Sequence, residues 1–344
     1  MRAAVVRAFN ADLSIETVPD PECPTDGVVL SVLACGVCRS DYHGWVGAHP
    51  KVIDGSIMGH EYCGQVVAAG PSAKYKVGDR LIAPFILGCG DCGACRTGAS
   101  NTCESAVVPG FGAPGAYAEY VAVPHDHNLV HLPQDMAPAL AAGLGCRFTT
   151  AWHALTDRAG VQAGEWVAVH GTGGVGLSAL LLAKMLGAKV IVVDVVAEKL
   201  THALALGADA AVNAAETDAA AAIRDITGGG AQVSIEALGI EATTNASVEC
   251  LATLGRHVHV GLPAGDGIMR INMRAIYAKQ LAFYGTRGMP AWKYPRLLDL
   301  IGRGAVDLSP MLDRQVALSD ASAELRAMNG PTRPGTAVIT DFAA

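Results

Sequence analysis

The chain has few aromatic and few charged residues for its length. Phe, Trp and Tyr make up 5% of its 344 residues and charged residues 17%, whereas apolar residues make up 51%. Its core must therefore be built mainly from Val, Ala, Leu and Ile, and the composition is too apolar for a disordered protein. At this length we expect two domains or one large α/β unit.

The sequence also lacks a long apolar run and an excess of basic residues. No segment offers about 18 uninterrupted apolar residues, and the first residues show no signal-peptide pattern. We therefore expect a soluble, cytoplasmic protein with no membrane partner. The formal net charge is −7, which argues against a nucleic-acid partner because phosphate backbones attract basic surfaces.

Four of the ten cysteines lie in one short stretch. Cys89, Cys92 and Cys95 are spaced C-x2-C-x2-C, and Cys103 follows after seven residues. Four thiolates at this spacing suit a closed tetrahedral zinc site. Iron–sulfur ligation and four unrelated thiols are alternatives, although the proline that follows the last cysteine in bacterial ferredoxins is missing. We expect a structural zinc.

Cys38, His60 and Cys146 are a second set of candidate metal ligands. Taken singly, each is equally typical of a buried thiol or a core histidine. Their neighbours are polar, however: Arg39-Ser40-Asp41-Tyr42-His43 follows Cys38, and Glu61 follows His60. A catalytic zinc needs three protein ligands, an open position and polar groups that orient its imidazole. Spacing alone does not show that the three residues converge.

From about residue 162 the pattern changes to alternating apolar strands and helices. A strand at 165–170 enters Gly171-Thr172-Gly173-Gly174-Val175-Gly176, which fits G-x-G-x-x-G, and a helix at 177–186 follows. Such glycines permit a tight turn and close approach to a pyrophosphate at the helix N-terminus. Asp194 ends the next strand, where an acidic residue forms hydrogen bonds with the adenosine ribose and repels a 2′-phosphate. The pattern predicts binding of NAD rather than NADP.

The other segments predict an α/β fold with two different halves. Strands at 211–213, 232–236 and 256–261 alternate with helices at 218–227 and 242–254, which is typical of a parallel sheet covered by helices. The first 125 residues instead contain short strands, such as 28–37 and 64–69, broken by Gly, Pro and Asp. They predict an antiparallel, partly barrel-like domain, to which a helix at 291–303 and a strand at 337–340 return.

Together, these landmarks resemble the zinc-dependent medium-chain alcohol dehydrogenases over nearly the whole chain. The matching segments are 38–43, Gly59-His60-Glu61, the four-cysteine stretch, Gly145-Cys146, 171–176 and Asp194. The resemblance implies a GroES-like β-barrel catalytic domain over 1–147 and 285–344. It also implies a Rossmann NAD-binding domain, a doubly wound parallel sheet, over 148–284.

The resemblance also implies roles for individual residues. Cys38, His60 and Cys146 would bind a catalytic zinc, with Glu61 as a transient ligand and Asp41 as the partner of His60. Ser40 and His43 would carry a proton relay. The implied cofactor-binding residues are Arg39, Thr150, Gly171, Gly173, Gly174, Val175, Gly176, Asp194 and Lys199, and the implied pocket residues are Trp45 and Phe85. The implied cofactors are two zinc ions per chain and NAD.

Two positions depart from the family pattern. Many relatives carry an arginine that holds the pyrophosphate where this chain has Thr336, and Arg333 is a nearby candidate to replace it. Arg147, directly after Cys146, is bulkier than the glycine of some relatives and is expected to change that corner of the site. Cys146 itself favours the alcohol dehydrogenase type, because some polyol-oxidising relatives use a carboxylate there.

We therefore expect an NAD-dependent alcohol dehydrogenase that interconverts a primary or secondary alcohol with an aldehyde or ketone. Trp45, Phe85, Phe111 and Leu262 indicate an apolar pocket for a medium-chain or aromatic alcohol. The nearest alternative is a polyol, threonine or aldehyde-adduct dehydrogenase of the same fold. A catalytically idle cofactor-binding protein would not need Cys38, Ser40, His60 and Cys146 together.

Two further expectations concern partners. A zinc-ribbon nucleic-acid binder would need a basic surface, whereas Asp91 and Glu104 outnumber Arg96 around the four-cysteine stretch. Members of the family assemble through the Rossmann sheet, so we expect a homodimer or homotetramer. The run 256–261 with Leu262 and Pro263 would lie near that interface.

Overall fold

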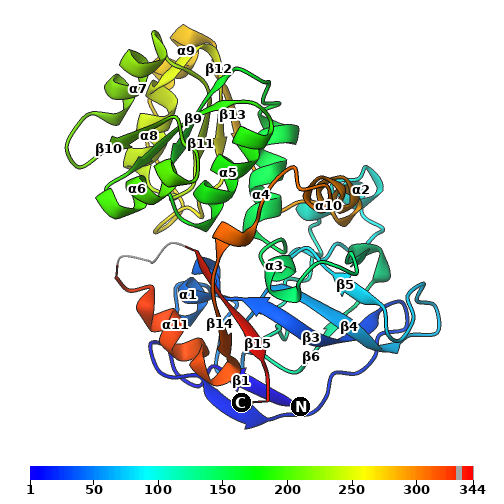
Figure 1. Ribbon diagram of the computed structural model, residues 1–344. Helices are drawn as coiled ribbons and strands as arrows, with labels where there is room; N and C mark the ends of the chain where they lie inside the picture. Colours follow the sequence, from blue (N-terminus) through cyan, green and yellow to red (C-terminus); the bar gives the residue numbers. More distant parts are fainter. Residues whose placement is uncertain (331–334, 344) are drawn as a thin grey trace. The chain divides into compact units, whose positions relative to one another are not determined.

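The chain folds into two compact units in the computed structural model, which describes residues 1–330 and 335–343 (Figure 1). The first unit comprises Met1–Thr149 and Gly288–Ala344, and the second comprises Thr150–Arg287. The sequence-based boundaries were 147/148 and 284/285. The second unit is thus one continuous segment that interrupts the first.

A mostly antiparallel sheet forms the centre of the first unit. Its strand order is β14-β15-β3-β4-β5-β7, and β6 also pairs with β3. The strands are β3 (Val28–Gly36), β4 (Glu61–Ala69), β5 (Arg80–Ile82), β6 (Tyr120–Val123), β7 (Val130–His131), β14 (Leu312–Ala317) and β15 (Thr336–Asp341). The last strand pairs with β3, as expected for a C-terminal segment that returns to the first domain. A separate antiparallel pair joins β1 (Arg2–Val5) to β2 (Ser14–Thr17).

Short helices connect the strands of the first unit. They are α1 (Arg39–Trp45), α2 (Gly93–Arg96), α3 (Pro138–Ala142), α10 (Tyr294–Gly302) and α11 (Ala321–Ala327), and α4 (Arg147–His153) runs into the second unit. The core of this unit is largely aliphatic, as the low aromatic content predicted, and Cys38 and Cys146 belong to it. Among the described residues, no helix is long and apolar enough to cross a membrane.

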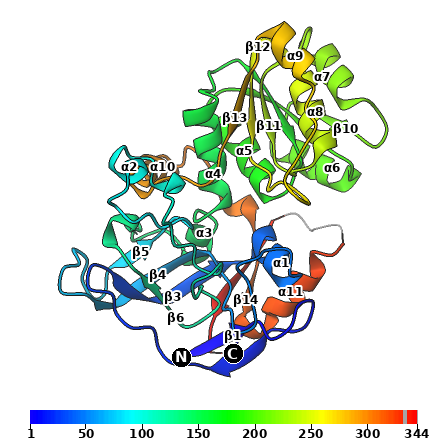
Figure 2. The same cartoon turned by 180° about the vertical axis from the view of Figure 1, so that it is seen from behind.

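The second unit is a parallel six-stranded sheet with the order β10-β9-β8-β11-β12-β13. Its strands are β8 (Trp166–His170), β9 (Lys189–Asp194), β10 (Ala210–Asn213), β11 (Ala231–Glu236), β12 (Leu251–His259) and β13 (Ala282–Gly285). Its helices are α5 (Gly174–Met185), α6 (Ala197–Ala205), α7 (Ala219–Thr227), α8 (Glu241–Glu249) and α9 (Met273–Lys279). Right-handed crossovers place α5 and α6 on one face of the sheet and α7 and α8 on the other. Figure 2 shows the same ribbon from the side opposite to that of Figure 1. The predicted doubly wound sheet is confirmed.

One predicted helix was too long. The pattern 242–254 predicted a single helix, but α8 ends at Glu249 and Leu251 already pairs with Ala231 of β11. The register of β12 then shifts, so that Arg256 is the residue that pairs with Val233. Leu254 adopts a φ of 63° within this irregularity. Sheet pairing thus overrides the local apolar pattern at the end of the helix.

Candidate functional site

Cys38, His60, Glu61 and Cys146 converge within the first unit. One ligand atom from each residue lies within 4.8 Å of the others, and all four residues are buried. Each lies at or next to the start of an element: Cys38 caps α1, His60 precedes and Glu61 begins β4, and Cys146 precedes α4. The fold thus gathers residues that are far apart in the sequence.

Asp41 fixes the orientation of His60. Its Oδ1 lies 3.0 Å from His60 Nδ1, and the carboxylate also accepts hydrogen bonds from the backbone N–H groups of Cys38 and Gly59. His60 Nε2 is buried and has no hydrogen-bond partner among the described residues. An unpaired imidazole nitrogen beside two thiols is the donor set of a zinc ion with three protein ligands. These residues therefore fit a zinc ion.

Burial and neighbouring charges shift the pKa values in this cluster. A hydrogen bond from Cys146 holds the pKa of the Cys38 thiol well below its usual range, and the Arg147 guanidinium acts in the same direction. Burial raises the pKa of Glu61 to about 7, although Arg147 opposes the shift. For His60, burial lowers the pKa, but the Asp41 carboxylate outweighs it and the net shift is upward.

Arg147 and Glu61 form a buried ion pair that the sequence analysis did not predict. Arg147 Nη2 lies 2.6 Å from Glu61 Oε2, and the two side chains are 8% and 0% exposed. The guanidinium also donates a hydrogen bond to the Thr336 hydroxyl. The two positions that depart from the family pattern are therefore in direct contact. The available signal was an arginine directly after a candidate ligand, at a position where some relatives have glycine.

Two aromatic rings lie against His60. The ring centroids of Phe85 and Phe111 are 5.8 Å and 5.2 Å from that of His60. Trp45 is only 1% exposed, belongs to the apolar core and donates its indole N–H to the Ala11 carbonyl. Phe85 and Phe111 thus lie beside the candidate zinc ligands, and a pocket-lining role for Trp45 stays a prediction.

The candidate relay residues lie on α1. Ser40 Oγ is 3.8 Å from Cys38 Sγ. His43 is partly buried, and burial together with Arg39 lowers its pKa, so its imidazole is neutral near neutral pH. The Arg39 guanidinium lies 4.3 Å above the Tyr42 ring and donates a hydrogen bond to the Met328 carbonyl. These contacts hold the Arg39 side chain between Tyr42 on the same helix and Met328 at the end of α11.

The four-cysteine stretch forms a second compact group. Ligand atoms of Cys89, Cys92, Cys95 and Cys103 lie within 4.8 Å of one another, and all four thiols are free. Cys92 Sγ and Cys103 Sγ are 3.7 Å apart. Zinc–sulfur bonds of about 2.3 Å in a tetrahedron place the sulfurs about 3.8 Å apart, so this group fits a zinc ion with no open position.

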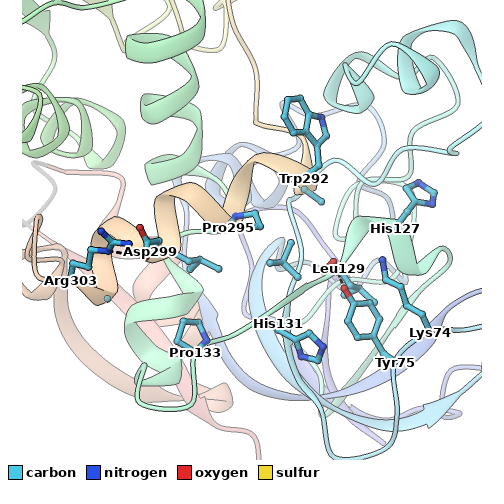
Figure 3. Close-up of a pocket in the computed structure, with 14 residues that line it drawn as sticks. Lys74, Tyr75, His127, Leu129, His131, Pro133, Trp292, Pro295, Asp299 and Arg303 are labelled. Atoms are coloured by element: carbon cyan, nitrogen blue, oxygen red, sulfur yellow. Dashed lines mark hydrogen bonds and ion pairs between the residues drawn. The ribbon is translucent and has the colours of Figure 1, made fainter.

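The remainder of the first unit anchors this four-cysteine lobe. Asn128 accepts a hydrogen bond from the Gly88 N–H at 2.8 Å and donates one to the Gly88 carbonyl at 3.0 Å. A hollow of about 750 Å³ opens nearby, between the segment 127–133 and α10, with Trp292 at one end (Figure 3). Its lining residues differ from the candidate zinc ligands.

The glycine-rich turn of the second unit has the geometry of a dinucleotide loop. Gly171 adopts a φ of 94°, and a Cβ at Gly176 would lie 1.8 Å from the Gly171 carbonyl oxygen. Gly173 caps α5, which begins at Gly174 and continues through Val175. The glycines therefore allow the turn to close tightly onto the N-terminus of a helix of 12 residues.

Asp194 holds this turn from the next strand. Its Oδ2 accepts hydrogen bonds from the Thr172 backbone N–H at 2.9 Å and from the Thr172 hydroxyl at 2.6 Å. Its Oδ1 accepts the N–H of Val195 at 2.8 Å. Burial raises the pKa of Asp194, but Thr172 and Lys199 outweigh it, and the net shift is downward. The carboxylate is therefore ionised at neutral pH.

Thr150 and Arg333 are two further residues that the sequence predicted to contact the cofactor. Thr150 is 6% exposed, and its hydroxyl has no hydrogen-bond partner among the described residues. Arg333, the candidate replacement for an arginine at position 336, lies outside the described residues. Its role stays a prediction.

Comparison with known proteins agrees with this architecture. Residues 24–134 match the alcohol dehydrogenase GroES-like domain, and residues 174–303 match the zinc-binding dehydrogenase family. An alcohol dehydrogenase of Geobacillus stearothermophilus is 37% identical over 269 residues, which is 77% of this chain and 78% of that protein. The sorbitol dehydrogenase of Bacillus subtilis (strain 168) is 33% identical over 92% of this chain and 90% of its own length.

A solved structure extends the similarity to the whole fold. The benzyl alcohol dehydrogenase of Acinetobacter calcoaceticus superimposes with a TM-score of 0.91 at 27% identity, over 99% of each chain. Both units thus have counterparts in the same relatives, in the same order along the chain. The chain belongs to the zinc-binding medium-chain alcohol dehydrogenase family and is an oxidoreductase of that family.

Proposed function

We propose that the protein is an NAD-dependent alcohol dehydrogenase with a catalytic zinc at Cys38, His60 and Cys146. The observation that carries this proposal is the buried cluster in which His60 Nε2, beside two thiols, has no hydrogen-bond partner in the described part of the chain. A second zinc, bound by Cys89, Cys92, Cys95 and Cys103, would stabilise the fold. This site has four protein ligands and no place for a substrate.

Residues around the catalytic cluster would prepare an alcohol for oxidation. A zinc ion held there would supply a Lewis acid that lowers the pKa of an alcohol hydroxyl, and NAD would supply the hydride acceptor. Ser40 Oγ would accept the hydroxyl proton while giving up its own, and the neutral imidazole of His43 would take up that proton and release it to solvent. Asp41 keeps His60 in one orientation, and Phe85 and Phe111 shield the apolar side of the site from water.

Residues of the second unit support NAD as the cofactor. The turn 171–176 places backbone N–H groups at the N-terminus of α5, where a pyrophosphate is favoured. Asp194 is ionised and would bond the adenosine ribose while repelling a 2′-phosphate. Arg39, Thr150 and Lys199 are further proposed contacts of the cofactor.

A medium-chain or aromatic alcohol, primary or secondary, is the proposed substrate. Phe85 and Phe111 beside His60 favour an apolar ligand over a polyol, and the benzyl alcohol dehydrogenase with the same fold acts on an aromatic alcohol. The second candidate is a polyol such as sorbitol, because the sorbitol dehydrogenase of Bacillus subtilis matches 92% of the chain. A threonine or aldehyde-adduct substrate is a further alternative.

We also propose that the chain forms a homodimer or homotetramer through the sheet of the second unit. β13 is the last strand of that sheet, and Phe283 on it is 42% exposed. Leu262, Ile268, Met273 and Tyr277, which lie nearby in the sequence, are 57–86% exposed. An unpaired edge strand with exposed apolar neighbours favours association with a second copy.

The test measures zinc content per chain and NADH formation with benzyl alcohol, 1-hexanol, ethanol, sorbitol and L-threonine. We expect two zinc ions per chain, turnover of benzyl alcohol or 1-hexanol, and loss of activity on chelation. Cys146→Ala should lose one zinc and the activity, whereas Cys23→Ala, at an exposed free cysteine, should retain both. Full zinc occupancy and activity in Cys146→Ala would contradict the proposed site, and turnover of sorbitol alone would favour the polyol alternative.

A further inference from the structure

The Glu61 carboxylate is held at both oxygens by one residue. Arg147 Nε donates to Oε1 at 3.0 Å, Nη2 donates to Oε2 at 2.6 Å, and the Arg147 backbone N–H lies 3.3 Å from Oε1. Paired N–H donors that meet a carboxylate in one plane fix its position as well as its charge. The pair is buried, so water does not compete for either partner.

Arg147 is anchored independently of Glu61. Its Nη2 also donates to the Val37 carbonyl at 3.1 Å, and its Nη1 donates to the Thr336 hydroxyl. These acceptors lie just beyond β3 and at the start of β15, which belong to the same sheet. The guanidinium is therefore tied to the sheet on one side and to the carboxylate on the other.

A glycine makes room for the carboxylate in this orientation. Gly36 pairs with Glu61 across β3 and β4, and a Cβ at Gly36 would lie 2.5 Å from Glu61 Oε2. A side chain at position 36 would displace that oxygen. The backbone of β3 and the guanidinium of Arg147 thus form a dedicated seat for a carboxylate.

The same carboxylate is also a potential metal ligand. A Glu61 oxygen lies within 4.8 Å of the ligand atoms of Cys38, His60 and Cys146. Carboxylates bind zinc at about 2.0–2.2 Å, and a fourth protein ligand converts an open zinc site into a closed one. A free Glu61 would therefore compete with a substrate oxygen for the fourth position.

We propose that Arg147 is a positioning residue that holds the Glu61 carboxylate in this seat and so keeps the fourth zinc position open. Arg147 acts through Glu61 and needs no contact with the substrate. This inference rests on the proposed catalytic zinc, and it assigns a function to the arginine that follows Cys146. It also accounts for the hydroxyl at position 336, which accepts a hydrogen bond from the Arg147 guanidinium.

The test replaces zinc with cobalt and measures ligand binding rather than turnover. Imidazole is the probe because it occupies an open metal position and shifts the visible bands of Co²⁺. We expect Arg147→Gln to weaken imidazole binding by about tenfold or more, comparable to the effect that loss of a metal ligand's partner has on metal affinity or activity. The bands of the ligand-free variant should also differ from those of the wild type, because a Glu61 oxygen replaces solvent in the fourth position. The double variant Arg147→Gln/Glu61→Gln should restore binding, because the competing carboxylate is gone.

Two further variants separate positioning from general stability. Arg147→Lys keeps the charge but not the paired donors, so its affinity for imidazole should lie between those of the wild type and Arg147→Gln. It also serves as the test if Arg147→Gln does not fold. Arg80→Gln removes an arginine of the same unit that binds the backbone carbonyls of Gln134 and Met136, and it should leave imidazole binding unchanged.

The outcomes distinguish failure of the positioning role of Arg147 from failure of the proposed catalytic zinc site. Unchanged imidazole binding in folded, cobalt-loaded Arg147→Gln or Arg147→Lys would overturn the positioning role, as would a double variant that shows no recovery. If the wild-type protein takes up cobalt without a thiolate-to-metal charge-transfer band from the site of Cys38 and Cys146, the catalytic zinc site itself is wrong. A variant that keeps only the lobe cysteines supplies the spectrum to subtract.

Discussion

Asp41 Oδ1 lies 3.0 Å from His60 Nδ1, and this contact leaves Nε2 as the imidazole nitrogen available to a metal ion. The same carboxylate accepts the backbone N–H of Cys38 at 2.9 Å. One buried side chain thus fixes two of the three proposed zinc ligands. Its effect on zinc binding should therefore be larger than that of an ordinary buried acid.

Asp41→Asn should lower zinc affinity at the catalytic site by about 10- to 100-fold, the range found when a partner of a metal-bound histidine is removed. Competition with a chelator, followed by the zinc content of each chain, measures the effect. Asp54→Asn is the matched control, because Asp54 is exposed and forms its ion pair with Arg7. Equal zinc retention in both variants would contradict the role of Asp41.

Cys92→Ser should release the lobe zinc while leaving the catalytic zinc in place. Its Sγ lies 3.7 Å from Cys103 Sγ, and a tetrahedral site that loses one of four thiolates binds zinc much more weakly. We expect zinc content to fall from two to one per chain and the melting temperature to drop by several degrees. Cys23→Ser, at an exposed thiol, controls for loss of a cysteine. A content of two zinc ions in Cys92→Ser would reject the lobe as a metal site.

The features that the sequence predicted well are those encoded within short segments. The turn 171–176 and its following acid, and the spacing from Cys89 to Cys103, each depend on residues close together in the chain. The contacts between Arg147 and Glu61 and between Arg147 and Thr336 instead join residues 86 and 189 positions apart. No local pattern encodes such a contact. The overlong helix at 242–254 was wrong for the same reason, because pairing of Leu251 with Ala231 decides where α8 ends.

Asp194→Gly should reduce the preference for NAD over NADP by at least about tenfold in kcat/KM, because a 2′-phosphate no longer meets a carboxylate. The same change should raise KM for NAD, since Asp194 also holds Thr172 in the glycine-rich turn. Thr172→Val separates the two effects: it removes one hydrogen bond to Asp194 but keeps the charge. It should raise KM for both cofactors without changing their ratio. An unchanged ratio in Asp194→Gly would show that another residue sets the preference.

Phe283→Lys should convert the proposed oligomer into a monomer. Phe283 lies on the edge strand β13 and is 42% exposed, and a lysine on an edge strand opposes pairing with a second sheet. Size-exclusion chromatography with light scattering measures the mass of the particle. Val77→Lys, an exposed apolar position of the first unit, is the matched control and should leave the mass unchanged. A wild-type protein that is already monomeric at micromolar concentration would contradict the oligomer.

Two buried histidines should make the fold sensitive to mild acid. Burial lowers the pKa of His170 to about 4, and burial together with His259 and His170 lowers that of His257 to about 3. The Ser247 hydroxyl lies 3.0 Å from His257 Nδ1, and a hydroxyl is a suitable hydrogen-bond partner for a neutral imidazole. Both side chains are therefore uncharged in the folded protein at neutral pH.

In the unfolded chain these histidines titrate near 6.5, so between about pH 6.5 and 4 the unfolded state binds more protons than the folded state. The free energy of unfolding should be fully retained above pH 6.5 and should fall as the pH is lowered, by up to about 1.4 kcal/mol per pH unit for each histidine. Urea titrations at pH 7.5, 6.5 and 5.5 measure this slope. His170→Met should reduce it by about the contribution of one histidine, whereas His131→Gln, at an exposed position, should not. Because the zinc ligands are the same in all three proteins, an equal slope in His170→Met and wild type would show that His170 is not the group responsible.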